Sequence, residues 1–199
     1  MKIYRLHFYF ISTFLFVNLL QAQQVYKVDS ANNGSTFNAC IGYIEDSGNG
    51  PGTNYGNNEN YVITICADQA NQILQLGSLY ILLSGSDSVV FYDGPDTLSP
   101  VLYTRTGGGI IGSYLFTTQG CVTVQMVTDS SGSWEGLSIP FQCLDKPQNE
   151  TPCDAEFLDV GAYCSYQYVD TRFADTTDFV DPGCAGYVGR HLWYKTVVP

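Results

Sequence analysis

The chain has 199 residues, a formal net charge of −11 at pH 7, a charged fraction of 14%, 20 glycines and 15 tyrosines. This negative charge argues against binding to nucleic acid, whose phosphates would repel it, and against electrostatic docking on anionic lipid. Its ordinary consequence is solubility, although an acidic surface is also compatible with divalent cations or cationic partners. The abundance of Gly, Tyr, Thr and Ser favours strands and turns over helices.

The first 23 residues have the layout of an export signal. Lys2 and Arg5 supply a positive start, an apolar run follows from residue 8 to residue 20, and small or polar residues around Ala22 offer a cleavage site. The run is short for a membrane span. We therefore expect a signal peptide at residues 1–23, a secreted or cell-surface location, and no membrane span once the signal is removed.

Short apolar segments separated by turn residues continue from Tyr61 to Cys143. Their spacing of about 8 to 12 residues is typical of a sandwich or barrel, and no stretch has an apolar stripe of helical period. The sequence therefore predicts an all-β fold, an antiparallel β-sandwich. The expected strands are 61–66, 73–83 with Gly77 as a break or bulge, 89–92, 101–103, 114–117, 121–127 and 137–143.

The last of these segments alternates clearly. Leu137, Ile139, Phe141 and Cys143 are expected on one face. Pro140 has no N–H to donate, so the segment is predicted to be an edge strand or to carry its proline on the outward side.

Seven cysteines follow the signal, at positions 40, 66, 121, 143, 153, 164 and 184. In an exported protein, cysteines usually form disulfides, and the absence of a C-x-x-C motif disfavours a zinc or thioredoxin-like site. Because the number is odd, one cysteine is free, pairs with another chain, or has its partner beyond this sequence.

A change of composition divides the chain after the predicted sandwich, which we place at residues 24–144. Residues 145–152 are polar, carry two prolines and have the composition of a linker. Residues 153–199 contain turn signals and a strand-like segment at the end of the chain, which leaves that strand little to pair with. We expect the truncated beginning of a second small β-module here; the competing interpretation is a complete cysteine-rich tail.

Four segments between Cys40 and Cys143 resemble a CUB domain. They are the Gly-, Tyr- and Asn-rich loop 46–61, the D-S-V-V-F-Y-D-G segment 87–94, the strand and acidic loop 121–130, and the closing strand 136–143. The resemblance implies a β-sandwich of the jelly-roll type, with disulfides Cys40–Cys66 and Cys121–Cys143. In two departures from the family pattern, Cys66 lies later than the family's second cysteine and Gly136 is not followed by an aromatic residue.

Two shorter segments resemble exported bacterial proteins. The Y-G-N-N-E-N-Y segment 55–61 is similar to the early loop of exported bacterial CUB domains. Residues 151–194, with their Cys and Trp-Tyr spacing, resemble a module found in surface proteins of type IX-secreting bacteria.

The CUB resemblance also implies a metal site, because many CUB domains hold Ca²⁺ through three acidic residues at one end of the sandwich. Asp87 and Asp129 match two of them, and hard oxygen ligands suit Ca²⁺. The third, a Glu expected near Leu82 or Ser84, is missing, and Glu59 is a candidate substitute. The hypothesis is weak Ca²⁺ binding; the alternative is that both aspartates are solvated turn residues.

The other motifs in the sequence do not indicate a nucleotide-binding or catalytic site. Residues 107–112 fit G-x-G-x-x-G, but a strand-like rather than a helical segment follows them, which disfavours a nucleotide site. His191 is the only histidine after the signal, and no G-x-S-x-G or H-E-x-x-H motif occurs, so we expect no enzyme. Trp134, in the loop beside Asp129, is the aromatic residue most expected to be exposed, and it serves either loop packing or ligand contact.

The sequence thus predicts an extracellular, non-catalytic recognition or adhesion module that binds a protein or glycan partner with weak calcium dependence. Two alternatives remain. One is the accessory region of an exported hydrolase or protease whose catalytic domain lies beyond residue 199; the other is a surface-layer component that associates with itself.

Overall fold

The computed structural model describes residues 24–48, 50, 52–150, 152–158, 171, 174 and 192–196. The regular structure of these residues is β apart from one short 3-10 helix, η1 (Pro152–Asp154). A search of the same residues for a helix of the length and apolarity needed to cross a membrane finds none. The predicted signal peptide lies outside the described residues.

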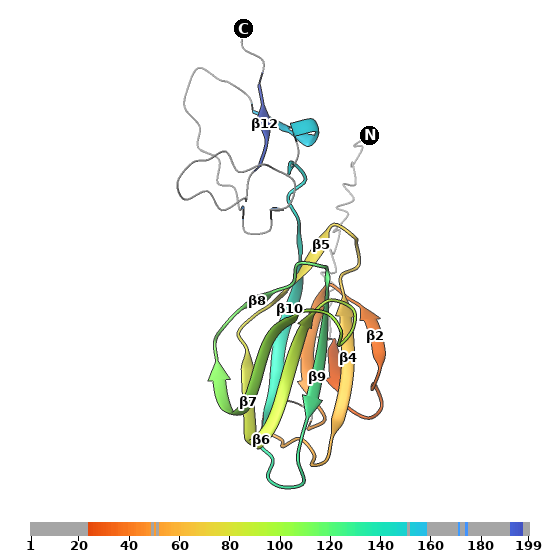
Figure 1. Cartoon of the computed structure of the whole chain (residues 1–199), viewed down its shortest axis with the longest axis vertical. Helices are drawn as coiled ribbons and strands as arrows, with labels where there is room; N and C mark the ends of the chain where they lie inside the picture. The colour runs from red at the N-terminus through yellow and green to blue at the C-terminus, as the bar shows by residue number, and fades with distance from the viewer. Residues whose placement is uncertain are drawn as a thin grey trace, which may run out of the picture.

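Ten strands form one continuous, curled sheet (Figure 1). In chain order they are β1 (Val25–Val28), β2 (Ser35–Asn38), β3 (Ile41–Asp46), β4 (Asn60–Cys66), β5 (Gln72–Leu76), β6 (Tyr80–Asp93), β7 (Val101–Ile111), β8 (Leu115–Phe116), β9 (Cys121–Val127) and β10 (Gly136–Asp145).

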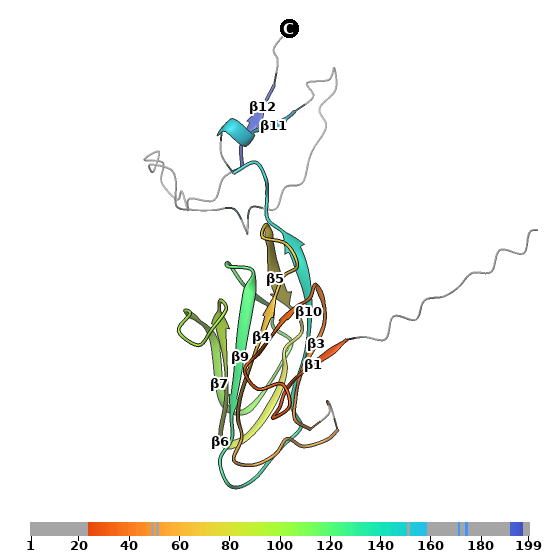
Figure 2. The ribbon, with the colours of Figure 1, turned by 90° about the vertical axis from the view of Figure 1, so that its right-hand side faces the viewer.

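The sheet folds into two layers because β6 changes partners along its length. Residues 80–82 of β6 pair with β10, whereas residues 88–93 pair with β9. One layer therefore runs through β1, β3, β10 and β5, and the other through β2, β4, β9 and the second half of β6. In Figure 2, β7 and β9 lie on one side of the molecule and β10, β3 and β1 on the other. The prediction of an all-β sandwich is confirmed, with parallel pairing only at β1–β3 and β2–β4 among the ten strands of this sheet.

Alternating residues of the two layers fill the space between them. Leu137, Ile139 and Phe141 of β10 are buried and Cys143 packs against them, so the predicted apolar face is confirmed. They meet side chains of the other layer such as Phe91. The other fully buried large residues of this core are Ile44, Ile63, Ile65, Leu74, Leu76, Leu79, Ile81, Leu83 and Met126.

The predicted strand 73–83 is two strands. β5 ends at Leu76 and β6 begins at Tyr80, so the break expected at Gly77 is confirmed. β6 then continues for 14 residues through a region expected to separate two strands, with a register shift against β7 between Leu83 and Ser88. Such a bulge bends a strand without ending it, which lets β6 serve both layers.

The glycine-rich segment after residue 106 lies mostly in β7 and not before a helix, as the sequence context indicated. Its first glycine, Gly107, has φ of +55°, and a Cβ there would lie 2.3 Å from the carbonyl oxygen of Gly85 in the β6 bulge. This glycine therefore permits close approach of two bent strands.

Strand β10 is internal rather than an edge strand, because it pairs with β3 on one side and with β6 and β5 on the other. The other predicted alternative holds: between the buried Ile139 and Phe141, the half-buried Pro140 lies on the outward side. Its position also fits the pairing of the strand, because Pro140 needs no N–H there. Its carbonyl accepts a hydrogen bond from the backbone N–H of Gly77 at 2.8 Å, so its nitrogen faces the interval between β5 and β6, where no ladder partner needs its proton.

The disulfide partners differ from those implied by the family resemblance. The bonds are Cys40–Cys143 and Cys66–Cys121, so the pairings Cys40–Cys66 and Cys121–Cys143 are wrong. Register is the reason: β4 ends where β9 begins, and Cys66 stands directly opposite Cys121 with their Cα atoms 4.0 Å apart. The late position of Cys66 in the sequence is what brings it to this end of the strand pair.

A few residues of the C-terminal region are also described. β11 (Glu156–Phe157) and β12 (Tyr194–Lys195) pair in parallel, and Asn149 bonds to the backbone of Trp193. Cys153 is an exposed free thiol. His191 and the cysteines at 164 and 184 lie outside the described residues, and the boundaries proposed for the linker and the second module stay predictions.

Candidate functional site

The loops that follow β3 and β9 and the bulge of β6 meet at one end of the sandwich, the lower end in Figure 1. Hydrogen bonds gather four acidic side chains there, and we call this region the carboxylate end. It is defined by Asp46, Glu59, Asp87 and Asp129.

Asp87 is the buried centre of this end. Its Oδ1 accepts the backbone N–H of Asp129 at 2.7 Å, and its Oδ2 accepts the hydroxyl of Tyr55 at 2.6 Å. The same hydroxyl accepts the backbone N–H of Ser84 at 2.7 Å. Burial raises the pKa of Tyr55 to about 12, and its hydrogen bond to Asp87 adds to the effect, so Tyr55 stays a neutral donor. Asp87 thereby joins three chain segments.

Asp129 is only partly buried and serves its own loop. Its Oδ2 accepts the hydroxyl of Ser86 at 2.6 Å, and its Oδ1 accepts the backbone N–H of Ser131 at 2.7 Å. The hydrogen bond from Ser86, followed by that from Ser131, lowers the pKa of Asp129. The group is therefore a carboxylate at neutral pH, close to solvent and to the buried Asp87.

The antiparallel pairing of β6 with β9, on which the predicted metal site depends, is present: Ser88 stands opposite Val127. The third acidic position is not filled. Glu59 accepts the hydroxyl of Ser47 at 2.9 Å and interacts electrostatically with Asp46. Among the described residues, no three His, Cys, Asp or Glu side chains form a group that could hold a metal ion. Calcium binding stays a prediction.

Asp46, at the end of β3, was not identified from the sequence as a site residue. It is fully buried, and its two oxygens accept the backbone N–H groups of Gly48 and Leu137, each at 2.6 Å. Burial raises the pKa of this carboxyl to about 6, and the charge of Glu59 contributes. An acidic residue between a strand and a glycine-containing turn was the available signal. Its partner Leu137 is 91 positions away, which pattern reasoning cannot supply.

Backbone bonds hold the same loops together. Asn58 donates to the carbonyl of Asp129 at 2.7 Å, and Tyr55 donates to the carbonyl of Trp134 at 3.1 Å. Trp134 is therefore anchored through its backbone while its side chain is 49% exposed. This exposure leaves both roles open that the sequence allowed, loop packing and ligand contact.

No family model and no curated protein matches the chain. Similar solved structures include the full extracellular region of zebrafish Gpr126/Adgrg6 (19% identity, TM-score 0.48, 60% of this chain and 15% of that one). They also include the CUB1-EGF-CUB2 domain of human MASP-1/3 (16%, 0.46, 59% and 46%) and the MASP-1 CUB2 domain bound to Ca²⁺ (17%, 0.44, 55% and 98%). The chain thus spans less than half of the first two structures, and similarity at this level carries no functional assignment.

Proposed function

We propose that residues 24–144 are an extracellular, non-catalytic recognition module of the CUB type, exported by the N-terminal signal, that binds a protein or glycan partner at its carboxylate end. Two disulfides support an oxidising compartment. The sequence segments that resemble the family supply the loop around Tyr55, the buried Asp87 and the loop after β9.

One observation carries the proposal: Asp129 donates its backbone N–H to the carboxylate of Asp87, which brings an acidic residue of the loop after β9 next to one in β6. Both oxygens of Asp87 and the Oδ2 of Asp129 each accept one hydrogen bond and keep a further lone pair, and Ser86 adds a hydroxyl oxygen beside Asp129. These hard oxygen donors fit Ca²⁺. With only two carboxylates the site is weak, and the remaining ligands would be carbonyl oxygens and water.

The test is the thermal stability of the full chain in millimolar Ca²⁺ and in EDTA. A ligand that binds only the folded state stabilises it by about 2.7 kcal/mol at a hundredfold excess over its dissociation constant. We expect the melting temperature to rise with Ca²⁺ by several degrees, and Mg²⁺ to act more weakly because it demands a stricter geometry.

Asp129→Asn is the decisive variant, because it removes the more accessible carboxylate while the backbone bond to Asp87 can persist. Asp96→Asn is the matched control: it removes an equal charge from the exposed turn after β6. The calcium effect should vanish in the first variant and persist in the second. Equal melting temperatures with Ca²⁺ and with EDTA for the unaltered chain would contradict the metal site.

A further inference from the structure

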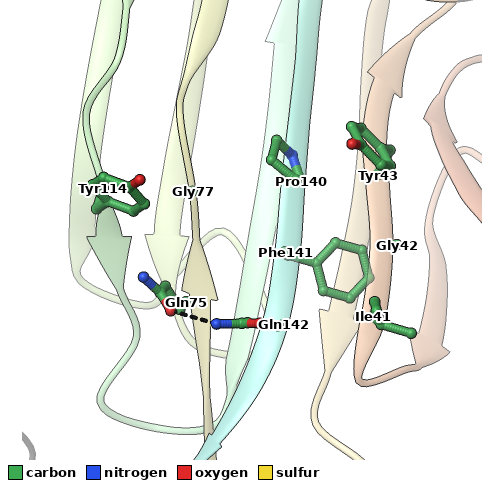
Figure 3. A pocket seen from close by; sticks show the side chains of 9 residues that line it. All are labelled: Ile41, Gly42, Tyr43, Gln75, Gly77, Tyr114, Pro140, Phe141 and Gln142. Carbon is green, nitrogen blue, oxygen red and sulfur yellow. Dashed lines mark hydrogen bonds between the residues drawn. The ribbon is translucent and has the colours of Figure 1, made fainter.

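A hollow lies on the outer face of the layer formed by β3, β10 and β5, and none of its lining residues belongs to the carboxylate end. Its volume is about 200 Å³. We call it the tyrosine groove. Figure 3 shows Tyr114, Pro140 and Tyr43 in a row across its upper part, with the amides of Gln75 and Gln142 below them.

The backbone places the two tyrosines. Pro140 stands opposite Tyr43 in the register of β10 with β3, and the carbonyl of Pro140 accepts the N–H of Gly77. A Cβ at Gly77 would lie 3.2 Å from the Tyr114 ring and 4.0 Å from Pro140. The missing side chain thus lets the ring of Tyr114 lie against the backbone, although this residue is 61% exposed. The groove is therefore formed before any ligand arrives.

An amide pair supplies directional polar groups beside these rings. The Nε2 of Gln142 donates to the Oε1 of Gln75 at 2.8 Å, and the pair is exposed to solvent. An amide carries one acceptor oxygen and two N–H donors. This hydrogen bond holds the two amides together. The carbonyl oxygen of Gln142 and the NH₂ group of Gln75 are then available to form hydrogen bonds with a ligand.

The residues that line the tyrosine groove favour an uncharged ligand. The net charge of the chain is −11, yet none of the described residues that line the groove is charged. A phosphate or carboxylate would find no cation there, and a basic peptide no anion. Aromatic faces suit the C–H face of a ring, and paired amides suit neighbouring hydroxyl groups. The volume equals about seven waters at roughly 30 Å³ each, which is close to the size of one pyranose ring.

We propose that the tyrosine groove binds one pyranose unit of a neutral glycan chain, with the sugar ring against Tyr114 and its hydroxyls bonded to Gln75 and Gln142. This site is separate from the calcium-dependent recognition proposed above, because it shares no residue with the carboxylate end.

The experiment is calorimetric titration of the full chain with neutral hexasaccharides of glucose, xylose, mannose and N-acetylglucosamine, in EDTA so that calcium plays no part. We expect at least one of them to bind with a dissociation constant of about 1 mM or below. Tyr114→Ala and Gln142→Ala should each weaken binding about tenfold or more, with melting temperatures close to that of the unaltered chain because both side chains are exposed.

Two control variants distinguish this site from others. Val101→Ala removes a side chain of similar exposure on β7, and Asp129→Asn alters the carboxylate end; both should bind the sugar normally. Absence of binding to every probe, or binding that is unchanged in Tyr114→Ala, would overturn the proposal. Loss of binding in Asp129→Asn alone would place the sugar at the carboxylate end instead. Self-association that Tyr114→Ala abolishes, without any sugar effect, would identify a second copy of the chain as the occupant.

Discussion

The two ends of the sandwich are closed by different chemistry. At one end, Cys66–Cys121 joins β4 to β9, and Cys40–Cys143 joins the start of β3 to β10. At the other end, the carboxylates of Asp46 and Asp87 accept backbone N–H groups and a tyrosine hydroxyl, and all of these donors except Gly48 lie far away in the sequence. The first closure is covalent, whereas the second depends on ionisable groups.

This difference indicates where the molecule can respond to its surroundings. A disulfide in an oxidising compartment does not change with pH or calcium. A buried carboxylate changes its charge within an ordinary pH range when burial raises its pKa, as for Asp46. The loops proposed to bind the partner lie at the end whose carboxylates can change their charge. The two disulfides at the opposite end keep the two layers in register during such a change.

The largest loss in the free energy of unfolding should come from removing a disulfide. The double variant Cys66→Ala/Cys121→Ala removes a cross-link between residues 55 positions apart. Without it the unfolded chain gains conformational entropy, which predicts a free energy of unfolding lower by about 4 kcal/mol. Urea denaturation measures it. Cys153→Ser, which alters the exposed free thiol, is the control and should change stability little. A loss no larger than that of the control would show that the strand pairing alone holds this end.

A smaller effect should appear when the carboxylate end is titrated. Burial raises the pKa of Asp46 from 3.8 to about 6. Between these values the folded state holds a proton that the unfolded state has released, so the stability contributed by Asp46 falls as pH rises from about 4 to about 6 and is constant above. Its size is at most about 3 kcal/mol, at 1.36 kcal/mol per pKa unit.

Urea denaturation at several pH values, with Asp46→Asn for comparison, measures this contribution. The lowered pKa of Asp129 acts in the opposite direction, but it is common to both proteins and cancels in their difference. The unaltered chain should lose stability relative to the variant as pH rises through the window. Parallel pH profiles for the two proteins would mean that Asp46 does not titrate there.

The smallest effect should follow from Tyr55→Phe. The hydroxyl of Tyr55 lies between a carboxylate oxygen of Asp87 and the N–H of Ser84, and the residue is buried. Its removal leaves two groups without this partner, which predicts a loss of about 2 kcal/mol in the free energy of unfolding. Tyr114→Phe, on an exposed ring, should change it by less than about 0.5 kcal/mol. Equal values for the two variants would mean that water replaces the buried hydroxyl.

The strands were largely predictable, because alternation of apolar and polar residues is a local property. The predicted segment 121–127 coincides with β9, and 61–66 is one residue shorter than β4. The segments 73–83 and 89–92 were divided in the wrong place, because β6 runs through a polar bulge that resembles a turn when only its own residues are considered. Apolar periodicity does not show whether a polar interval ends a strand or bends it.

The candidate site was predictable only in part. Asp87 and Asp129 could be singled out because they match two acidic positions of the family that the sequence resembles. The role of Asp46, the link through Tyr55 and the groove between Tyr43 and Tyr114 each depend on residues from distant segments. Composition and spacing carry no information about which of these segments become neighbours.

The sequence by itself determined the all-β class, most strand positions, the inward face of β10 and the cysteines available for disulfides, since these follow from local periodicity and residue type. Tertiary structure alone decided the disulfide partners, the pairing of β6 with both β10 and β9, and the placement of Pro140 in a strand with neighbours on both sides. Each of these depends on strand register, and register is set by packing of the whole core: a shift of one residue would turn every buried side chain of a strand to the opposite face.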